Sequence, residues 1–577
     1  MRQSQPTVSD RHDDSTHSSR IGALLTASAL VAAAATAARA DAVPTFGGVT
    51  LVTSRLDLLT STGGSSFEIV GNAVAWSVLE PNGHDFDANA LRSLDQQVRV
   101  AAAAGLEQIV VRVRPGGGPM APFAGDPSTW PVDSATYDQK EGEYLGPKYA
   151  FGTYSYPPRV LTRDDSGQTS PWYDFVYALA KRYDGTTVDP QTATKKLPRV
   201  AAWSCVEEPD VKSYWYGTGR DYFGGVNGDP AVGTLPSFYR AVKAANPAAS
   251  VVGAALTSHQ VGFYMAHEMA RAEGNAYDAT VRAWGTSYFN SNYPMQRVFA
   301  TNIPDAQLYT QQENDPEARR ARAFIDSAFA GSAPSFYDVL GIHSYDNWSL
   351  LSDMIEWQLT RLDQPKRVWI TELGFADVPP RGTATLVSDA DQPAWLVKKL
   401  VLALAAGVEH TSYSPMLAAP GFASLYPSTT SERPARRSMQ LIGQSLNQAS
   451  GYRFGSSFVS GGTTFYVFDH ADGASHIAVA WRDSDSATQH TRPILGIPSG
   501  ATVRVLDDLE HVVSTSNLNL TFGVQPLVIE WGPAVVDADG DGYPAGIDCD
   551  DQSSAVNPGA TEGGADSRDN DCDPITQ

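Results

Sequence analysis

The sequence predicts an α/β protein whose main domain is a parallel (β/α)8 barrel. Three observations lead to this prediction. Short β-rich runs alternate with amphipathic helical runs over roughly 400 residues, the length of a large barrel domain. Two of the β-rich runs, at 200–210 and 367–374, end in carboxylates and then in a residue that stops a strand. The sequence contains no G-x-G-x-x-G or Walker pattern, the phosphate loops of doubly wound and P-loop sheets.

Composition narrows the class of protein. The chain has 577 residues, which is more than one ordinary domain. Its 42 Lys and Arg against 64 Asp and Glu give a formal charge of −22, which argues against nucleic acid or an anionic membrane as a partner. The 12 Trp and 24 Tyr can fill a large core, and flat rings also suit stacking on sugars.

The first 40 residues are typical of an export signal. A polar start with three arginines precedes an uncharged, Ala-rich stretch, and Ala38-Arg39-Ala40 then offers a cleavage site. We expect a mature chain that begins at Asp41, with Ala40-Asp41-Ala42 as an alternative site and an uncleaved anchor as the alternative outcome. The predicted location is therefore secreted or cell-surface, with a bacterial-type signal.

The first half of the barrel is read from its apolar runs. We expect strand one within 46–52, strand two at 73–81, a helix at 91–104 and strand three at 109–115. The aromatic-rich segment 116–170 follows. Long loops in compact domains are usually functional, so we expect it to wall the substrate site or, alternatively, to pack on its own aromatic side chains.

The second half continues the same alternation. We expect strands four to eight at 200–209, 251–256, 338–345, 367–374 and 408–416, with helices at 172–183, 238–245, 351–362, 394–406 and 439–446. Cys205 lies in strand four and is expected to be a buried small hydrophobe.

Two strand ends carry the candidate chemistry. The run from Val200 stops at Glu207, Glu208 and Pro209, and since proline cannot donate to a ladder, we expect the strand to end there. The run at 367–374 carries Glu372 to its end. The carboxyl ends of barrel strands meet at one face, so these carboxylates should lie close together. A proton donor and a facing carboxylate are what cleavage of an acetal requires.

These stretches resemble the clan A glycoside hydrolases, TIM barrels with an acid/base Glu after strand four and a nucleophile Glu on strand seven. The matching strand-four residues are Trp203, Glu208, Pro209 and Asp210, with Glu207 in place of the usual Asn. The strand-seven run Trp369-Ile-Thr-Glu372-Leu-Gly374 matches closely, and family 39-like xylosidases look nearest. No arginine lies near the predicted strand two, where clan members usually carry one.

The resemblance implies a retaining hydrolase of a poly- or oligosaccharide, with Glu208 as acid/base, Glu372 as nucleophile and no catalytic cofactor. It also implies a set of substrate-binding residues, namely Trp76, Glu207, Trp215, His343, Tyr345 and Tyr413. The alternative reading is a non-catalytic carbohydrate-binding or surface-adhesion protein.

The adjacent glutamates need to be told apart. Side chains alternate along a strand, so Glu207 and Glu208 cannot face the same sugar oxygen unless a bulge intervenes. Proline follows Glu208, as it follows the acid/base of the clan motif, and this assigns the role to Glu208.

The character of the sequence changes at Gly451. Short alternating β runs at 465–468, 476–481, 501–506 and 526–531 predict a small antiparallel sandwich, for packing support or for sugar binding. The predicted units are therefore a signal at 1–40, a catalytic barrel at 41–450, a β-sandwich at 451–534 and an Asp-rich tail at 535–577.

The tail carries a cation-binding pattern. Asp537, Asp539, Asp541 and Asp548 occupy positions 1, 3, 5 and 12 of an EF-hand-like loop, with glycine at position 6, so we expect Ca²⁺ to be preferred to Mg²⁺. Cys549 and Cys572 can form a disulfide in an oxidising compartment. The tail resembles the metal-binding repeats of secreted bacterial proteins and could attach the protein to a cell surface; a disordered acidic tail is the alternative.

Overall fold

The computed structural model describes most of the barrel and sandwich and isolated parts of the tail. The described residues are 45–49, 55–70, 74–81, 85–115, 171–206, 208–211, 215, 219–224, 233–272, 316–375, 387–417, 419, 422–446, 450–483, 488–491, 502–506, 512–514, 519–532, 539, 550, 552–557, 560, 568 and 570. The predicted export signal, the segment 116–170, Glu207, Cys549 and Cys572 lie outside them.

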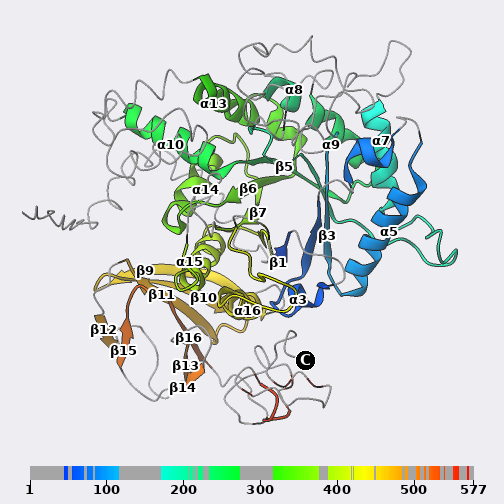
Figure 1. Cartoon of the computed structure of the whole chain (residues 1–577). Helices are drawn as coiled ribbons and strands as arrows, with labels where there is room; N and C mark the ends of the chain where they lie inside the picture. The colour runs from blue at the N-terminus through cyan, green and yellow to red at the C-terminus, as the bar shows by residue number, and fades with distance from the viewer. Residues whose placement is uncertain are drawn as a thin grey trace, which may run out of the picture.

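Strands β1 to β8 form a closed barrel in sequence order, with every neighbouring pair parallel and β8 paired to β1 (Figure 1). The strands are β1 (Thr45–Gly48), β2 (Ser66–Ile69), β3 (Gln108–Val113), β4 (Ala202–Cys205), β5 (Ser250–Leu256), β6 (Val339–Ser344), β7 (Arg367–Leu373) and β8 (His410–Tyr413). The predicted (β/α)8 architecture is confirmed.

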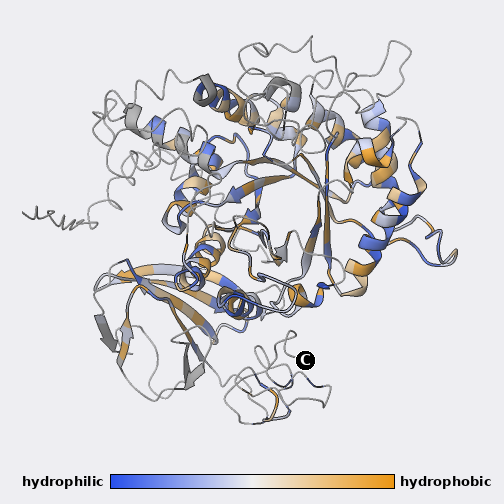
Figure 2. Cartoon of the chain, in the orientation of Figure 1, coloured by the Kyte–Doolittle hydropathy of each residue, from blue (hydrophilic) through white to orange (hydrophobic). Residues whose placement is uncertain are grey.

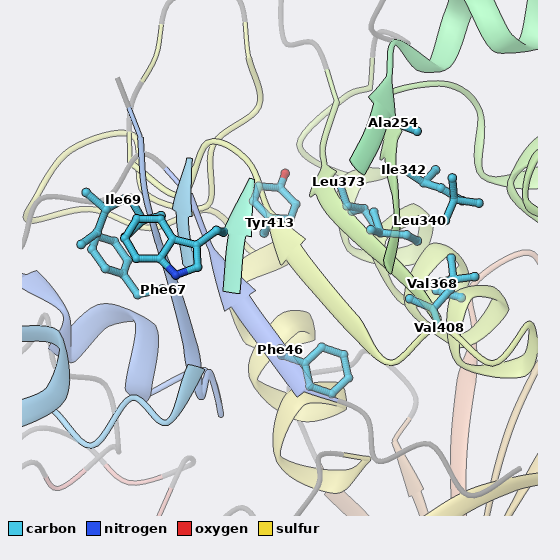
Figure 3. Close-up of a cluster of buried hydrophobic side chains, with 14 of the residues drawn as sticks. Phe46, Phe67, Ile69, Ala254, Leu340, Ile342, Val368, Leu373, Val408 and Tyr413 are labelled. Carbon is cyan, nitrogen blue, oxygen red and sulfur yellow. The ribbon is translucent and has the colours of Figure 1, made fainter. Parts of the chain in front are cut away.

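Apolar side chains fill both sides of the strands, as expected when a parallel sheet is covered by helices. Val110, Ala202, Val252, Val339 and Trp369, from five consecutive strands, form one buried cluster. A much larger cluster joins the strands to the helices, and Figure 3 shows part of it. These two layers position the strand ends.

Helices surround the barrel (Figure 1), and Figure 2 shows hydrophobic and hydrophilic residues interspersed along them. The α-helices are α3 (Asp57–Thr60), α4 (Trp76–Leu79), α5 (Ala88–Ala103), α7 (Pro171–Arg182), α8 (Gly219–Phe223), α9 (Thr234–Ala245), α10 (Ser258–Ala272), α13 (Pro316–Phe329), α14 (Leu351–Leu359), α15 (Gln392–Ala405) and α16 (Ala435–Ser445). Two 3-10 turns are η6 (Ala333–Phe336) and η7 (Trp348–Leu350). Within the ranges given above, no helix is both long and apolar enough to cross a bilayer.

The prediction of strand two at 73–81 is wrong. The second strand is β2, and the apolar run after it forms the short helix α4. Trp76 packs against Trp172 and Phe175, with ring centroids 5.5 and 5.7 Å away. Its indole N–H donates to Glu80 at 2.9 Å. The apolar run is therefore a packing element, while the second strand is short and carries the charged Glu68.

The C-terminal unit contains a six-stranded antiparallel sheet in the order β14-β13-β16-β11-β10-β9 and a two-stranded sheet, β12-β15. Their bounds are β9 (Tyr452–Ser460), β10 (Thr463–His470), β11 (His476–Arg482), β12 (Thr488–Thr491), β13 (Thr502–Leu506), β14 (Val512–Ser514), β15 (Asn519–Phe522) and β16 (Leu527–Gly532). Phe465 and Phe522 meet between the sheets, with ring centroids 5.1 Å apart. The predicted antiparallel sandwich is confirmed.

The other face of the six-stranded sheet packs on the barrel. Trp481 of β11 lies edge-on to Trp348 of η7, with ring centroids 6.0 Å apart. The ammonium of Lys398, on α15, lies 4.3 Å from the Trp348 ring centroid and 5.6 Å from that of Trp481. In Figure 1, α15 and α16 lie between the barrel strands and this sheet. The sandwich and barrel thus share one hydrophobic core.

Candidate active site

Polar side chains converge at the carboxyl ends of the barrel strands. Glu68 lies on β2 and Arg112 on β3, Glu208 follows β4, His343 lies on β6 and Glu372 lies on β7. They come from positions as far apart as 68 and 372 in the chain. The closure of the barrel brings them together at its carboxyl-terminal face, where (β/α)8 barrels have their active sites.

Glu372 is held at both carboxylate oxygens. Arg112 Nη1 donates to its Oε1 at 2.6 Å, and the Tyr345 hydroxyl donates to its Oε2 at 2.7 Å. Burial alone would raise its pKa, but His343, Arg112 and Tyr345 outweigh burial and lower the pKa of Glu372 to about 2. Glu372 is therefore an ionised, oriented carboxylate at neutral pH.

Arg112 is itself fixed by Glu68. Arg112 Nε donates to one Glu68 oxygen and Nη2 to the other, each at 2.8 Å, in a bidentate pair. Both side chains are buried. Because the fork sets the plane of the guanidinium, its remaining nitrogen, Nη1, is aimed at Glu372. A neighbouring charge pair thus orients the candidate nucleophile.

A β-bulge in β7 also aims Glu372. The β6–β7 register pairs Ile342 with Ile370 and then His343 with Glu372, so Thr371 is the extra residue. A bulge shifts the side-chain alternation of the strand that contains it. Without the bulge, the residue opposite His343 would be Thr371, and the carboxylate would leave this position.

Glu208 lies beyond the end of its strand, so the prediction that Glu208 lies at the strand tip is wrong. Strand β4 ends at Cys205. Val206 and Glu208 have φ angles of 54° and 41°, in the left-handed region that side chains with a Cβ rarely adopt. The Glu208 N–H donates to Ala255 O at 3.1 Å. The alternation rule therefore does not apply at this glutamate, because its orientation comes from a strained turn.

Asp210 stabilises that turn through hydrogen bonds to Thr257. Its buried carboxylate accepts hydrogen bonds from the backbone N–H and the hydroxyl of Thr257, at 3.0 and 3.2 Å. Burial, with the Glu208 charge, raises the pKa of Asp210 to about 7. Asp210 therefore fixes the segment after β4 to the end of β5.

His343 connects the two candidate catalytic carboxylates. Its Nδ1 lies 2.9 Å from Glu208 Oε1 and 3.8 Å from Glu372 Oε2. Burial lowers the pKa of His343, but Glu372 and Glu208 outweigh it and raise the pKa above its ordinary value. Its buried Nε2 has no hydrogen-bond partner among the described residues.

The predicted substrate-binding set divides into two groups. Tyr345 lies beside Glu372 and donates a hydrogen bond to it. His343 is fully buried, with no surface open to a sugar, and its contact is with Glu208. Trp76, Trp215 and Tyr413 are at most 2 % exposed and belong to the hydrophobic core.

Packing explains these last three positions. Trp215 lies edge-on to Tyr222, and the Tyr413 hydroxyl, in the cluster of Figure 3, donates to Ala423 O at 2.5 Å. A ring with no accessible face cannot stack on a sugar. The structure gives these three aromatic residues core positions with no face open to a sugar, while Glu207 lies outside the described residues.

Two site residues, Arg112 and Glu68, were missed from the sequence. Each is a single charge within an otherwise apolar strand, in the runs Ile-Val-Val-Arg-Val and Ser-Phe-Glu-Ile. A buried charge must be paired, so the single charges in these two strands indicate a buried ion pair. Arg112 lies on β3 and not near the predicted strand two.

The tail is described at few positions. Asp539 is described, whereas Asp537, Asp541 and Asp548 lie outside the described residues. Asn557 and Asn570 are buried, and Asn557 N donates to Asn570 O at 2.9 Å. Among the described residues, no three His, Cys, Asp or Glu side chains gather into a metal-binding group.

Comparisons with known proteins matched one family model at the C-terminus and a set of solved structures. The family model Cu-binding MopE, described as "Putative metal-binding motif", matches residues 548–577. No curated protein matches the chain. Solved structures similar to it include glycoside hydrolases of families 39, 30 and 44.

Three of these structures show the extent of the likeness. A family 39 glycoside hydrolase from Bacteroides cellulosilyticus WH2 is 14% identical, with 85% of this chain and 81% of that chain covered and a TM-score of 0.49. A glucosidase from Croceicoccus marinus is 12% identical, with 85% and 96% covered and a TM-score of 0.45. A family 30 endoxylanase from Clostridium papyrosolvens C71 is 11% identical, with 85% and 97% covered and a TM-score of 0.43. Identities this low do not transfer a substrate.

Proposed function

We propose that the protein is a retaining glycoside hydrolase that cleaves O-glycosidic bonds of a poly- or oligosaccharide. One observation carries the proposal: Glu208 and Glu372 approach the same nitrogen, Nδ1 of His343, at 2.9 and 3.8 Å. Their nearest oxygens are therefore no further apart than the sum of these two distances. This limit excludes most of the ~6.5–9.5 Å range of inverting enzymes and includes the ~5–5.5 Å of retaining ones.

The environments of the two carboxylates differ in the way the mechanism requires. Glu372, ionised between Arg112 and Tyr345, attacks the anomeric carbon and forms a covalent glycosyl ester. Glu208 gives its proton to the leaving oxygen as the glycosidic bond breaks. It then takes a proton from the water that attacks the ester, and Glu372 is released as a carboxylate.

Hydrolysis of a panel of aryl glycosides and polysaccharides tests the activity. For any substrate cleaved, NMR of the first product should show the starting anomer. A 2-deoxy-2-fluoro glycoside of the same sugar should label the peptide that contains Glu372, as read by mass spectrometry. Inversion at the anomeric carbon would contradict the mechanism.

The non-catalytic alternative makes the opposite prediction. A carbohydrate-binding or adhesion protein would bind members of the panel, measured by calorimetry, without cleaving any of them. We favour the hydrolase over the binding protein because a lowered pKa of Glu372 and its paired arginine serve bond cleavage and are not needed for binding.

We further propose that the protein is exported and that its tail binds Ca²⁺. The aspartates at 537, 539, 541 and 548 supply only oxygen, and the segment 535–577 contains no histidine, so the donors suit a hard cation better than copper. The bound cation would order the tail and has no part in the barrel's chemistry. Attachment to a cell surface through this tail would follow if the ordered tail bound surface polymers.

A further inference from the structure

A buried lysine joins the two strand ends that carry the site. Lys399, on α15, has no exposed surface. Its Nζ donates to Ser344 O at 2.9 Å and to Gly374 O at 3.3 Å. Ser344 ends β6, one residue after His343, and Gly374 lies two residues after Glu372. One side-chain nitrogen therefore joins the ends of both strands from helix α15.

The strands need such a connection at this point. The bulge at Thr371 interrupts the regular ladder between β6 and β7. Beyond it, Gly374 N donates to Ser344 O at 3.0 Å, and that same oxygen accepts the hydrogen bond from Lys399. Lys399 thus reinforces the pairing that resumes after the bulge.

The position of Gly374 affects the Tyr345 ring, which lies against it. A Cβ at Gly374 would overlap the Ser414 carbonyl oxygen and would lie 2.6 Å from the Tyr345 ring. The backbone is therefore wedged between these two groups, and any movement of Gly374 changes the space left for the ring. The Tyr345 hydroxyl in turn donates to Glu372.

Burial makes Lys399 a costly residue for packing alone. Removing an ammonium from water costs several kcal/mol, and apolar replacements of buried charges are often neutral or stabilising. Its other neighbours are Asp346, which opposes the effect of burial on its pKa, and the Phe375 ring, with a centroid 4.4 Å from Nζ. Most of the other buried residues of this helix are Leu, Val and Ala. A role beyond packing accounts for a buried amine at this position.

We propose that Lys399 is a positioning residue that holds the Ser344 and Gly374 carbonyls and so fixes Tyr345 and Glu372 against each other. It acts through the backbone and does not touch the substrate. Its kinetic consequence rests on the proposed hydrolase function, whereas its geometric consequence does not.

Lys399→Met and Lys398→Met test this proposal as a matched pair in the full-length protein. Both remove a buried ammonium from the same helix, but Lys398 lies between Trp348 and Trp481 at the contact with the sandwich. On an activated aryl glycoside, Lys399→Met should lower kcat roughly 10–100-fold with little change in KM, the usual result of misplacing a reacting group. Lys398→Met should keep the kcat of the natural protein.

Crystal structures of both variants give a readout that does not depend on activity. In Lys399→Met we expect the Tyr345–Glu372 or Arg112–Glu372 hydrogen bond to be lost, and in Lys398→Met both should remain. Unchanged site geometry and kcat in Lys399→Met would overturn the proposal, as would equal losses of kcat in the two variants. If no glycoside is cleaved by the natural protein, the proposed function fails, and the crystal structures still decide the role of Lys399. If Lys399→Met does not fold, Lys399→Gln replaces it, with the same readouts and a smaller expected loss.

Discussion

His343 Nδ1 and Glu208 Oε1 are 2.9 Å apart. This contact ties the candidate acid/base to β6, the neighbour of strand β7, which carries the candidate nucleophile. An Nδ1–H that donates to Oε1 leaves the other oxygen of Glu208 to carry the transferable proton. The two carboxylates near Nδ1 favour a proton on that nitrogen, in keeping with the raised pKa of His343. His343 thus orients Glu208 and needs no contact with the sugar.

Glu208→Gln should lower turnover of unactivated substrates by roughly 10²–10⁴-fold, because general acid catalysis is lost. The loss should shrink for aryl glycosides with good leaving groups, which depart without protonation. Glu207→Asn is the control, and it should be tolerated far better. Steady-state kinetics on both substrate classes checks this, and a dead Glu207→Gln beside an active Glu208→Gln would reverse the assignment.

Tyr345→Phe should move the acid limb of the kcat/KM profile to higher pH. The hydroxyl donates to ionised Glu372, and removing a donor disfavours the charged form, so the pKa of Glu372 rises from about 2. The natural protein should show no loss from protonation of Glu372 until the pH falls toward that value. An acid limb that does not move would mean that Arg112 and His343 alone determine the pKa of Glu372.

Trp481→Ala should destabilise the protein by about 3–5 kcal/mol, the range for truncating a buried aromatic side chain. The ring is 1 % exposed and contacts Trp348 and Lys398 at the junction of sandwich and barrel. Denaturant unfolding followed by fluorescence measures the change. Val459→Ala, at a 68 % exposed position of β9, is the control and should change little.

The full-length protein should bind Ca²⁺ more tightly than Mg²⁺, because the tail offers many flexible oxygens and no compact octahedral cage. Calorimetry with Ca²⁺, Mg²⁺ and Cu²⁺ on the natural protein and on a triple Asp→Asn variant at 537, 539 and 541 checks this. The variant should lose the Ca²⁺ heat. Hydrolytic activity should survive removal of residues 535–577, and tight Cu²⁺ binding without Ca²⁺ binding would contradict the proposal.

The exported protein should begin at Asp41, since signal peptidase recognises small residues three apart and Ala38-Arg39-Ala40 provides them. N-terminal sequencing of the protein from culture medium checks this. Ala38→Lys should block the cut and leave the precursor with the cells. Recovery of chain with intact Met1 in membranes of the unaltered strain would support the uncleaved anchor.

Local patterns in the sequence determined the barrel, the sandwich and both candidate catalytic glutamates. The alternation of β and helical runs, the Glu-Pro break after strand four and the Trp-Ile-Thr-Glu run are short-range features, because strand periodicity and proline chemistry act within a few residues. Glu208 and Glu372 could therefore be chosen before any tertiary contact was known.

Tertiary structure alone decided which other side chains reach the site. Arg112 meets Glu68 and Glu372 across 44 and 260 residues of chain, and only barrel closure makes those contacts. Trp76 is the reverse case: its flat ring could stack on a sugar, but it lies in the core. Burial depends on which elements cover a residue, and the bulge at Thr371 depends on how two distant strands pair. Neither property is encoded in the residues beside it, which is why neither could be read from the sequence.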